Sequence, residues 1–259
     1  MWHITPLDVG TLMVTRSTQI ARHGAKFDVG KIVAQPCIVW LLTDLETKRH
    51  ILVDAGPCED TEWASMHHNK FLRSSEQTLS SVLGKHGLRC EDIDTVILTH
   101  LHWDHAYGAL ELPNAKLYVQ SKELRYAVAP LPNDLKVYEN KLGEDIPYFL
   151  KMYRQYVFLD GDLTFDDGLE IITLPGHSPG SQGVVVDTEQ GKVIIAGDLI
   201  SVKEGWDLRL PSGLFTSAED CYRSFEKMEK YHALVVGSHD YASFDLLKKL
   251  KNEGGKSND

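Results

Sequence analysis

The segment Thr-His-Leu-His-Trp-Asp-His at residues 99–105 constrains this chain more than any other stretch. It directly follows a short apolar run with the β-branched content of a buried strand. On extended backbone, side chains two residues apart leave the same face, so His100 and His102 can point at one metal ion. Asp104 and His105 follow where the chain is expected to turn, and they can face a second point. Imidazole and carboxylate donors without thiolate suit Zn, Fe, Ni or Mn, so the sequence predicts a metal site at the end of a strand.

Three later positions repeat the pattern of a strand, a glycine and then a metal-binding side chain. They are His177 within Gly176–Gly180, Asp198 after Gly197, and His239 within Gly237–Asp240. Loops at strand ends are where rigid scaffolds commonly hold catalytic groups. One histidine after a strand is most often a structural residue, but three such positions together with residues 99–105 predict a shared centre.

Taken in order, and with Asp54 after an early strand, these residues resemble the metallo-β-lactamase superfamily over nearly the whole chain. The resemblance implies an α/β fold, an αββα sandwich of two mixed β-sheets flanked by helices. It also implies two divalent metal ions, Zn²⁺ first, with Fe, Mn, Ni or Co as alternatives. Asp54 resembles the acid that orients ligands in this family without binding metal. The resemblance also implies the metal ligands: His100, His102 and His177 at the first metal, Asp104, His105 and His239 at the second, and Asp198 bridging both.

The chemistry that this resemblance implies is hydrolysis. Two dications hold a bridging hydroxide at neutral pH, one metal polarises the substrate carbonyl, and the hydroxide attacks it. Asp104 or Asp198 would orient the nucleophile or take up a proton. The stretches 175–181 and 238–240 look most like the N-acyl homoserine lactonase group, the enzymes of quorum quenching. We therefore expect a dinuclear metal-dependent hydrolase that opens a lactone or cleaves a carboxylic ester.

The sequence departs from that group at two points. The lactonases usually carry a tyrosine three residues after the bridging aspartate, where this chain has Ser201, and His-Ala-Gly-Gly where this chain has Tyr107 in the third position. Tyr107 and Ser201 therefore join Asp104 as candidate catalytic residues. Trp103 and Trp206 are further aromatic candidates for the pocket.

Two related activities remain as alternatives. Glyoxalase II-like thioesterases use the same ligands, and a mononuclear iron persulfide dioxygenase would leave His105 and His239 unused. A nuclease of the superfamily would normally bring an extra domain or a basic surface. A binding protein that only kept the fold would be expected to have lost ligands, and this chain has lost none, so an enzyme is expected.

The composition indicates which partners and which cellular compartment are expected. The 259 residues carry 27 basic and 37 acidic side chains, a formal net charge of −10, which argues against nucleic acid or an anionic membrane as partner. Four dispersed cysteines without CxxC spacing, no evident signal peptide and no apolar run of about 20 residues predict a cytoplasmic protein. The partner expected is a small lactone or ester. A homodimer is possible, as in similar proteins.

Residues 1–259 are expected to form a single domain, with a helical excursion at about 121–156 that covers one side of the site. The first 15 residues are expected to form a hairpin of strands 2–7 and 11–14, and residues 16–31 a long loop that helps wall the pocket. His23, His67 and His68 are expected on loops or the surface. The other expected elements are strands 33–42, 50–53, 92–98, 115–119, 157–159, 169–174, 183–186, 193–196 and 233–236, helices 74–86, 121–129 and 217–232, and a frayed tail from Lys248.

Overall fold

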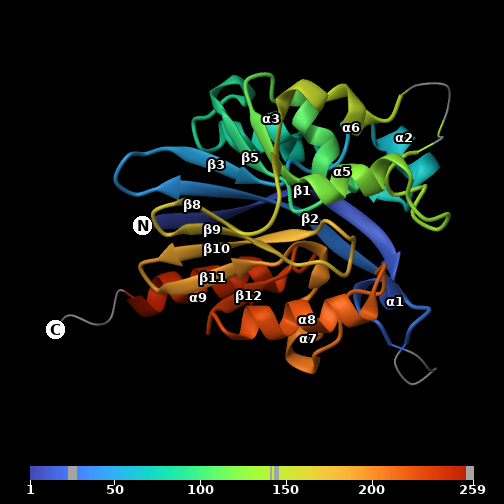
Figure 1. The fold of residues 1–259 in the computed structure, drawn as a ribbon. Coiled ribbons are helices and arrows are strands. Elements are labelled where there is room, and N and C mark those ends of the chain that lie inside the picture. Colours follow the sequence, from blue (N-terminus) through green and yellow to red (C-terminus); the bar gives the residue numbers. More distant parts are fainter. Residues whose placement is uncertain (23–27, 141, 143–145, 255–259) are drawn as a thin grey trace.

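The computed structural model describes residues 1–22, 28–140, 142 and 146–254, with side chains to residue 248. Within this part of the chain, two mixed β-sheets lie face to face with helices on their outer sides (Figure 1). The first sheet has the strand order β4-β1-β2-β3-β5-β6-β7 and the second has the order β12-β11-β10-β9-β8. The predicted αββα sandwich is confirmed.

The first sheet consists of β1 (Trp2–Thr15), β2 (Ile32–Asp44), β3 (His50–Val53), β4 (Phe71–Leu72), β5 (Thr95–Ile97), β6 (Lys116–Gln120) and β7 (Tyr156–Leu159). The second consists of β8 (Leu163–Asp166), β9 (Leu169–Thr173), β10 (Gln182–Thr188), β11 (Gly191–Ile195) and β12 (Leu234–Val236). The described α-helices are α1 (Arg16–Gln19), α2 (Thr61–His67), α3 (Leu79–Gly84), α4 (Trp103–Ala106), α5 (Ser121–Val128), α6 (Tyr148–Lys151), α7 (Lys203–Leu208), α8 (Ala218–Glu229) and α9 (Ala242–Gly254).

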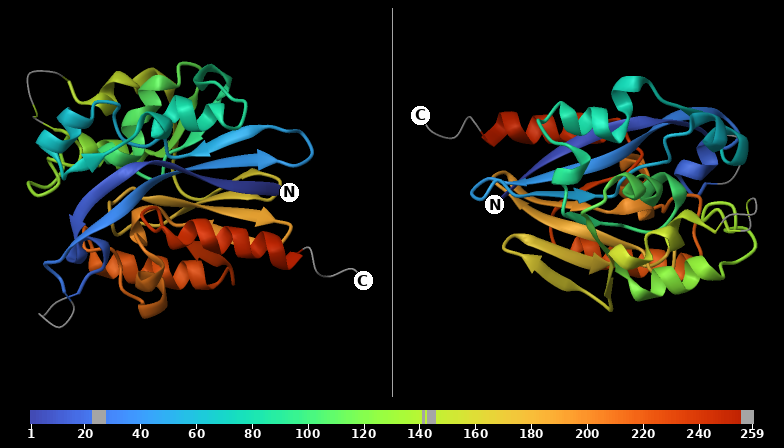
Figure 2. Two further views of the ribbon diagram at one scale, coloured as in Figure 1. Left: turned by 180° about the vertical axis from the view of Figure 1, so that it is seen from behind. Right: turned by 90° about the horizontal axis from the view of Figure 1, so that it is seen from above.

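The sandwich explains why its central strands are apolar on both faces. In β2, Trp40 belongs to the cluster between the sheets, while the next residue, Leu41, packs in the outer cluster beneath α3. In the second sheet, Ile171 of β9 faces the first sheet and Ile172 packs against α8. A strand covered on both sides reads as a continuous apolar run. Seen from behind, the helices keep to the outer sides of the two sheets (Figure 2, left).

The loops that leave the carboxyl ends of β3, β5, β9, β11 and β12 carry the side chains singled out in the sequence. β3 pairs in parallel with β5, and β11 in parallel with β12, so each pair presents its carboxyl ends together. Parallel pairing in both halves of the sandwich therefore brings loops that are distant in sequence to one edge of the molecule.

The predicted N-terminal hairpin is wrong. Both halves of β1 pair antiparallel with the same strand, β2, and the register shifts between Asp8 and Thr11. Gly10 lies there with φ of +132°, and a Cβ at Gly10 would lie 2.5 Å from the Phe71 ring. The glycine signal therefore marks a β-bulge in one long strand rather than a turn between two.

Other elements also differ from the prediction, among them residues 16–19, which were expected in a long loop and form α1. The helix expected over 74–86 is split, because Ser74 caps a short 3-10 turn, η2 (Ser75–Gln77), and Thr78 then caps α3. Strand β8 lies at the edge of the second sheet and was not predicted. The tail expected to fray from Lys248 instead continues α9 to Gly254.

One predicted helix start is confirmed. Helix α8 begins where predicted, with the Ser217 hydroxyl accepting the backbone N–H of Asp220 at 3.2 Å. The 121–156 segment contains α5, α6 and the 3-10 turn η5 (Tyr153–Gln155) in its described part. No helix of the described residues is both long enough and apolar enough to cross a membrane.

Candidate metal centre

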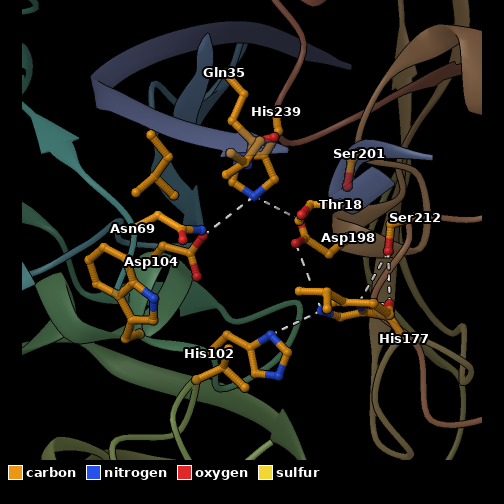
Figure 3. Close-up of a pocket in the computed structure, with 15 residues that line it drawn as sticks. Thr18, Gln35, Asn69, His102, Asp104, His177, Asp198, Ser201, Ser212 and His239 are labelled. Carbon is orange, nitrogen blue, oxygen red and sulfur yellow. Dashed lines mark hydrogen bonds and ion pairs between the residues drawn. The ribbon is translucent and has the colours of Figure 1, made fainter. Parts of the chain in front are cut away.

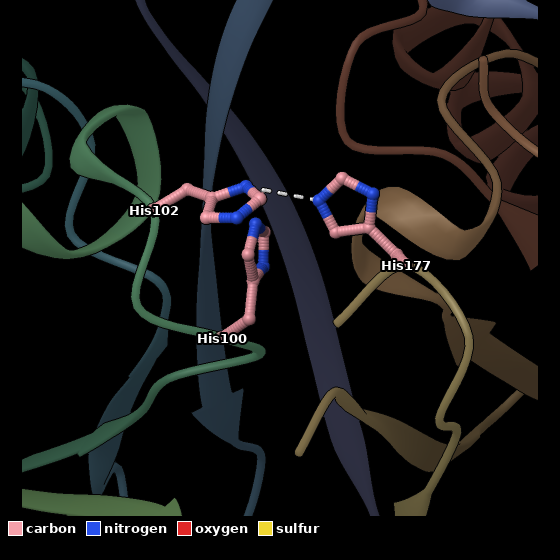
Figure 4. Close-up of side chains that lie close together, drawn as sticks. All are labelled: His100, His102 and His177. Carbon is pink, nitrogen blue, oxygen red and sulfur yellow. Dashed lines mark hydrogen bonds between the residues drawn. The ribbon is translucent and has the colours of Figure 1, made fainter. Parts of the chain in front are cut away.

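A first group of three imidazoles comes from two loops (Figure 4). His100 and His102 lie on the loop that follows β5, and His177 lies on the loop that follows β9. One ring nitrogen of each lies within 4.8 Å of the others, and His177 Nε2 is 3.0 Å from His102 Nδ1. All three residues are buried. The two sheets thus contribute to one cluster of nitrogen donors.

A second group lies beside the first and shares Asp198 with it (Figure 3). His105 Nε2 and His239 Nε2 each lie 3.1 Å from Asp198 Oδ1. Asp104 Oδ2 lies 3.5 Å from His239 Nε2. The other oxygen of Asp198, Oδ2, lies 3.8 Å from His177 Nε2 in the first group. Asp198 therefore lies between the two groups, with one carboxylate oxygen toward each.

The rear nitrogens of three of these imidazoles are fixed by acceptors. The Nδ1 atom of His105 lies 2.8 Å from Asp54 Oδ2, that of His177 lies 2.6 Å from the carbonyl oxygen of Leu214, and that of His239 lies 2.8 Å from the carbonyl oxygen of Pro36. Because these oxygens can only accept, Nδ1 carries a proton, and Nε2 is the nitrogen that faces the centre.

Asp54 occupies the position predicted for an orienting acid. Its side chain has no exposed surface, and its Oδ1 atom accepts the Thr99 N–H at 2.7 Å. Its Oδ2 atom accepts the Thr99 hydroxyl at 2.9 Å as well as the proton of His105. The same carboxylate thus supports the start of the 99–105 segment and one imidazole of the second group.

The donors fit a pair of divalent ions. His100 Nε2 is buried and makes no hydrogen bond to any described residue. A buried polar atom without a partner needs an explanation, and a metal ion among three converging imidazoles supplies one. The second group adds carboxylate oxygens to two imidazoles, a donor set that also suits a divalent cation.

The electrostatics differ between the two groups. Burial lowers the pKa of His100 and His102 well below the usual value, so both rings are neutral, as metal ligands must be. Burial acts in the same direction on His105 and His239, but the charges of Asp198 and Asp104 and the hydrogen bond to Asp198 together outweigh it and raise their pKa well above the usual value. Burial raises the pKa of Asp198, and the charges of His239 and His105 outweigh it and hold the pKa well below its usual range. A metal ion bound by His105, His239 and Asp198 would therefore compete with protons for the two imidazoles.

The residues that line the cavity over this centre can be compared with the other candidate pocket residues. Ser201 and Trp103 line it, beside Asp104 (Figure 3). Tyr107 is not among the lining residues, and its ring stacks on Tyr148 at 4.7 Å between centroids. Trp206 likewise does not line the cavity, because it stacks on the core ring of Phe225 at 5.5 Å. In this structure Tyr107 and Trp206 each complete an aromatic stack outside the cavity lining, and a part for Tyr107 in catalysis stays a prediction. The full lining is Leu12, Val14, Thr18, Gln35, Asn69, His102, Trp103, Asp104, Val137, His177, Asp198, Ser201, Ser212, Leu214 and His239.

Some residues near the centre escaped the sequence analysis. The side chain of His68, expected at the surface, is 3% exposed because Nε2 lies 2.8 Å from Glu139 and the ring stacks on Trp103. Cys37 offers its sulfur within 4.8 Å of donor atoms of Asp104 and His239. His68 and Cys37 belong to no recognisable sequence motif. They lie near the centre only because segments distant in the sequence pack together. His23 lies outside the described residues.

The comparisons with known proteins agree with this geometry. Residues 34–239 match the model of the Metallo-beta-lactamase superfamily, and the chain belongs to this superfamily. It is 27% identical over 223 residues to the N-acyl homoserine lactonase AiiA of Bacillus thuringiensis subsp. kurstaki, covering 82% of this chain and 84% of that one. It is 29% identical over 228 residues to an N-acyl homoserine lactonase of Bacillus cereus, with the same coverage.

The solved structures show the same fold. A mutant of B. thuringiensis AiiA with N-decanoyl-L-homoserine bound at its active site superposes with a TM-score of 0.75, 23% identity, and coverage of 94% of this chain and 95% of that one. The prediction of a metal-dependent hydrolase of this superfamily is confirmed.

Proposed function

We propose that this protein opens the ring of N-acyl homoserine lactones or closely similar lactones at a dinuclear zinc centre. The observation that carries the proposal is the pair of donor groups joined by Asp198. A mononuclear enzyme has no use for the second group, in which His105 and His239 are oriented by Asp54 and by a backbone carbonyl. The relatives named as N-acyl homoserine lactonases supply the substrate class.

The proposed ligands are His100, His102 and His177 for the first ion, Asp104, His105 and His239 for the second, and Asp198 for both. When bound, such a pair of ions polarises a substrate carbonyl and lowers the pKa of water to near neutrality. Zinc fits because nitrogen and oxygen donors suit its usual coordination. A solved structure titled a dizinc quorum-quenching lactonase, AidC, shares this fold with a TM-score of 0.68.

Three features of the cavity act on the substrate directly. Asp104 lines it with a side chain that is 12% exposed, so its carboxylate can orient the attacking water and receive its proton. The Ser201 hydroxyl lines it three residues after Asp198 and can donate to the oxygen released on ring opening. Apolar side chains, including those of Leu12, Val14 and Leu214, form a wall suited to an acyl chain.

The experiment is a combined metal and substrate analysis of one preparation. Protein purified from zinc-supplemented medium is analysed for metal and assayed with lactones, thioesters and β-lactams. Two metal ions per chain and lactone opening that is lost in Asp104→Ala support the proposal. Thioesters cleaved far faster than lactones would refute the substrate assignment. One iron per chain with no ester hydrolysis would refute the dinuclear hydrolase and favour the dioxygenase.

The remaining proposals concern the whole molecule. We propose a cytoplasmic location, which the four unpaired cysteines support. Residues 1–259 as one domain, and assembly into a homodimer, stay predictions. Limited proteolysis tests the first, and sedimentation of the purified protein tests the second.

A further inference from the structure

Glu123 is a buried carboxylate that no step of the proposed reaction uses. It lies on α5 with no exposed surface. Its Oε1 atom accepts the backbone N–H of Leu101 at 2.9 Å and the hydroxyl of Tyr138 at 2.8 Å. Its Oε2 atom accepts the hydroxyl of Ser178 at 2.6 Å and the backbone N–H of Gly180 at 3.2 Å. The two oxygens thus bind two different segments of the chain.

Both segments carry ligands of the first metal position. Leu101 stands between His100 and His102, and Ser178 directly follows His177. The first segment leaves β5 of one sheet and the second leaves β9 of the other. One carboxylate therefore joins the two loops whose separation sets the distance between His177 and the other two imidazoles.

The packing around Glu123 leaves little room for adjustment. A Cβ on Gly180 would lie 2.2 Å from the backbone nitrogen of Glu123, so the 176–180 loop rests directly on α5. The carbonyl oxygen of Leu101 accepts the hydroxyl of Tyr148, which fixes this peptide from its other side. A buried polar network in which every member is paired holds a single geometry.

The four partners of Glu123 are all donors. None of the ion pairs found among the described residues involves Glu123, so the negative charge is stabilised by hydrogen bonds alone. A glutamine has the same shape but carries an NH₂ group in place of one oxygen. Whichever way that amide turns, its NH₂ group faces a backbone N–H that cannot accept a hydrogen bond, that of Leu101 or that of Gly180, so one backbone contact to a ligand loop is lost.

The second group does not depend on Glu123. His105 is held by Asp54 and His239 by the carbonyl of Pro36, and neither contact passes through α5. We infer that Glu123 is a positioning residue that fixes the His100–His102 loop against the His177 loop and thereby sets the affinity of the first metal position alone. This inference rests on the proposed two-metal function.

The test measures stepwise Zn²⁺ affinity by competition with a chromophoric chelator, using Glu123→Gln. Removing an outer contact of a metal ligand typically weakens metal binding by about 10–100-fold. We expect one of the two Zn²⁺ affinities to fall by about this factor and the other to stay unchanged. A general loss of fold would weaken both together. In parallel, the Co²⁺-loaded variant should show a changed ligand-field spectrum for one ion only.

Glu139→Gln is the matched control. Glu139 is 6% exposed and lies in the same excursion, but its carboxylate accepts from Trp63 and His68 rather than from a ligand loop. This variant should keep both Zn²⁺ affinities. Ser178→Ala is a milder second variant, since it removes one hydroxyl from Oε2 and leaves the charge paired. It should weaken the same Zn²⁺ position by a smaller factor, and it decides the question if Glu123→Gln fails to fold.

The outcomes separate this inference from the proposed function. Wild-type protein that binds fewer than two Zn²⁺ ions refutes the two-metal centre itself. Wild-type protein with two ions, and a folded Glu123→Gln variant with both affinities unchanged, refutes only the role of Glu123. Equal weakening of both positions in Glu123→Gln or in Ser178→Ala refutes it as well.

Discussion

Asp54→Asn should destabilise the protein and weaken the second metal position with almost no change in shape. Asp54 has φ of +62°, a conformation that asparagine tolerates as well as aspartate, so the substitution adds no backbone strain. The carboxylate accepts three donors, two from Thr99 and one from His105. An amide has one acceptor oxygen, so its NH₂ group faces either the Thr99 N–H or the His105 N–H.

The magnitude follows from that unpaired donor. Leaving one buried donor without an acceptor costs about 1–3 kcal/mol. For a chain of this size, that corresponds to a fall in Tm of roughly 2–12 °C. In the orientation in which the NH₂ group faces His105, the imidazole also loses the contact that fixes it, and the affinity of one metal position should then fall by about 10–100-fold.

Thermal unfolding of the chelator-treated protein and Zn²⁺ competition on the same preparation measure the two effects. Asp60→Asn is the matched control, because Asp60 caps α2 by accepting two backbone N–H groups and asparagine caps a helix equally well. A Tm and two Zn²⁺ affinities equal to those of the wild type in Asp54→Asn would show that Asp54 does not support His105.

Three further outcomes are expected. In the metal-free protein, the raised pKa of His105 and His239 gives stability that is full below pH about 6.5 and lost as pH rises. The lowered pKa of His100 and His102 has the opposite effect and reduces stability as pH falls below about 6.5. For these four groups together, the denaturation midpoint should therefore be highest near pH about 6.5, and a midpoint that only rises or only falls with pH would contradict the directions of these pKa shifts. Tyr107→Phe should change kcat/KM for lactones less than about twofold, because the ring stacks away from the cavity; a loss of about 10²-fold would restore it as a catalytic donor. Chelation should abolish hydrolysis and lower the Tm, and Zn²⁺ should restore both, since an ion bound only to the native state stabilises it.

Much of the site could be predicted because its ligands sit in short segments with local signals. A strand that ends in a glycine or a turn, followed by His or Asp, is visible in one dimension, and this pattern located His177, Asp198 and His239. Asp54 could be placed by the resemblance to the family. The structure brings all of these side chains together at one edge of the sandwich.

Two placements that the sequence did not indicate share a different cause. Gly10 has the same freedom of φ in a bulge as in a hairpin turn, and only the pairing of both halves of β1 with β2 decides between them. Tyr107 lies close in sequence to the ligand His105, but a helical turn directs its ring to Tyr148 and away from the cavity. Proximity along the chain does not fix the direction of a side chain.

The sequence by itself determined the donor types, their order and the strand-rich framework, because these depend on local composition and periodicity. The tertiary structure alone decided which distant groups share a network. Glu123 is a lone acid on a short helix, with no motif to mark it, yet it joins loops from two sheets. Such a role depends on packing between segments far apart in the chain, and local patterns carry no information about it.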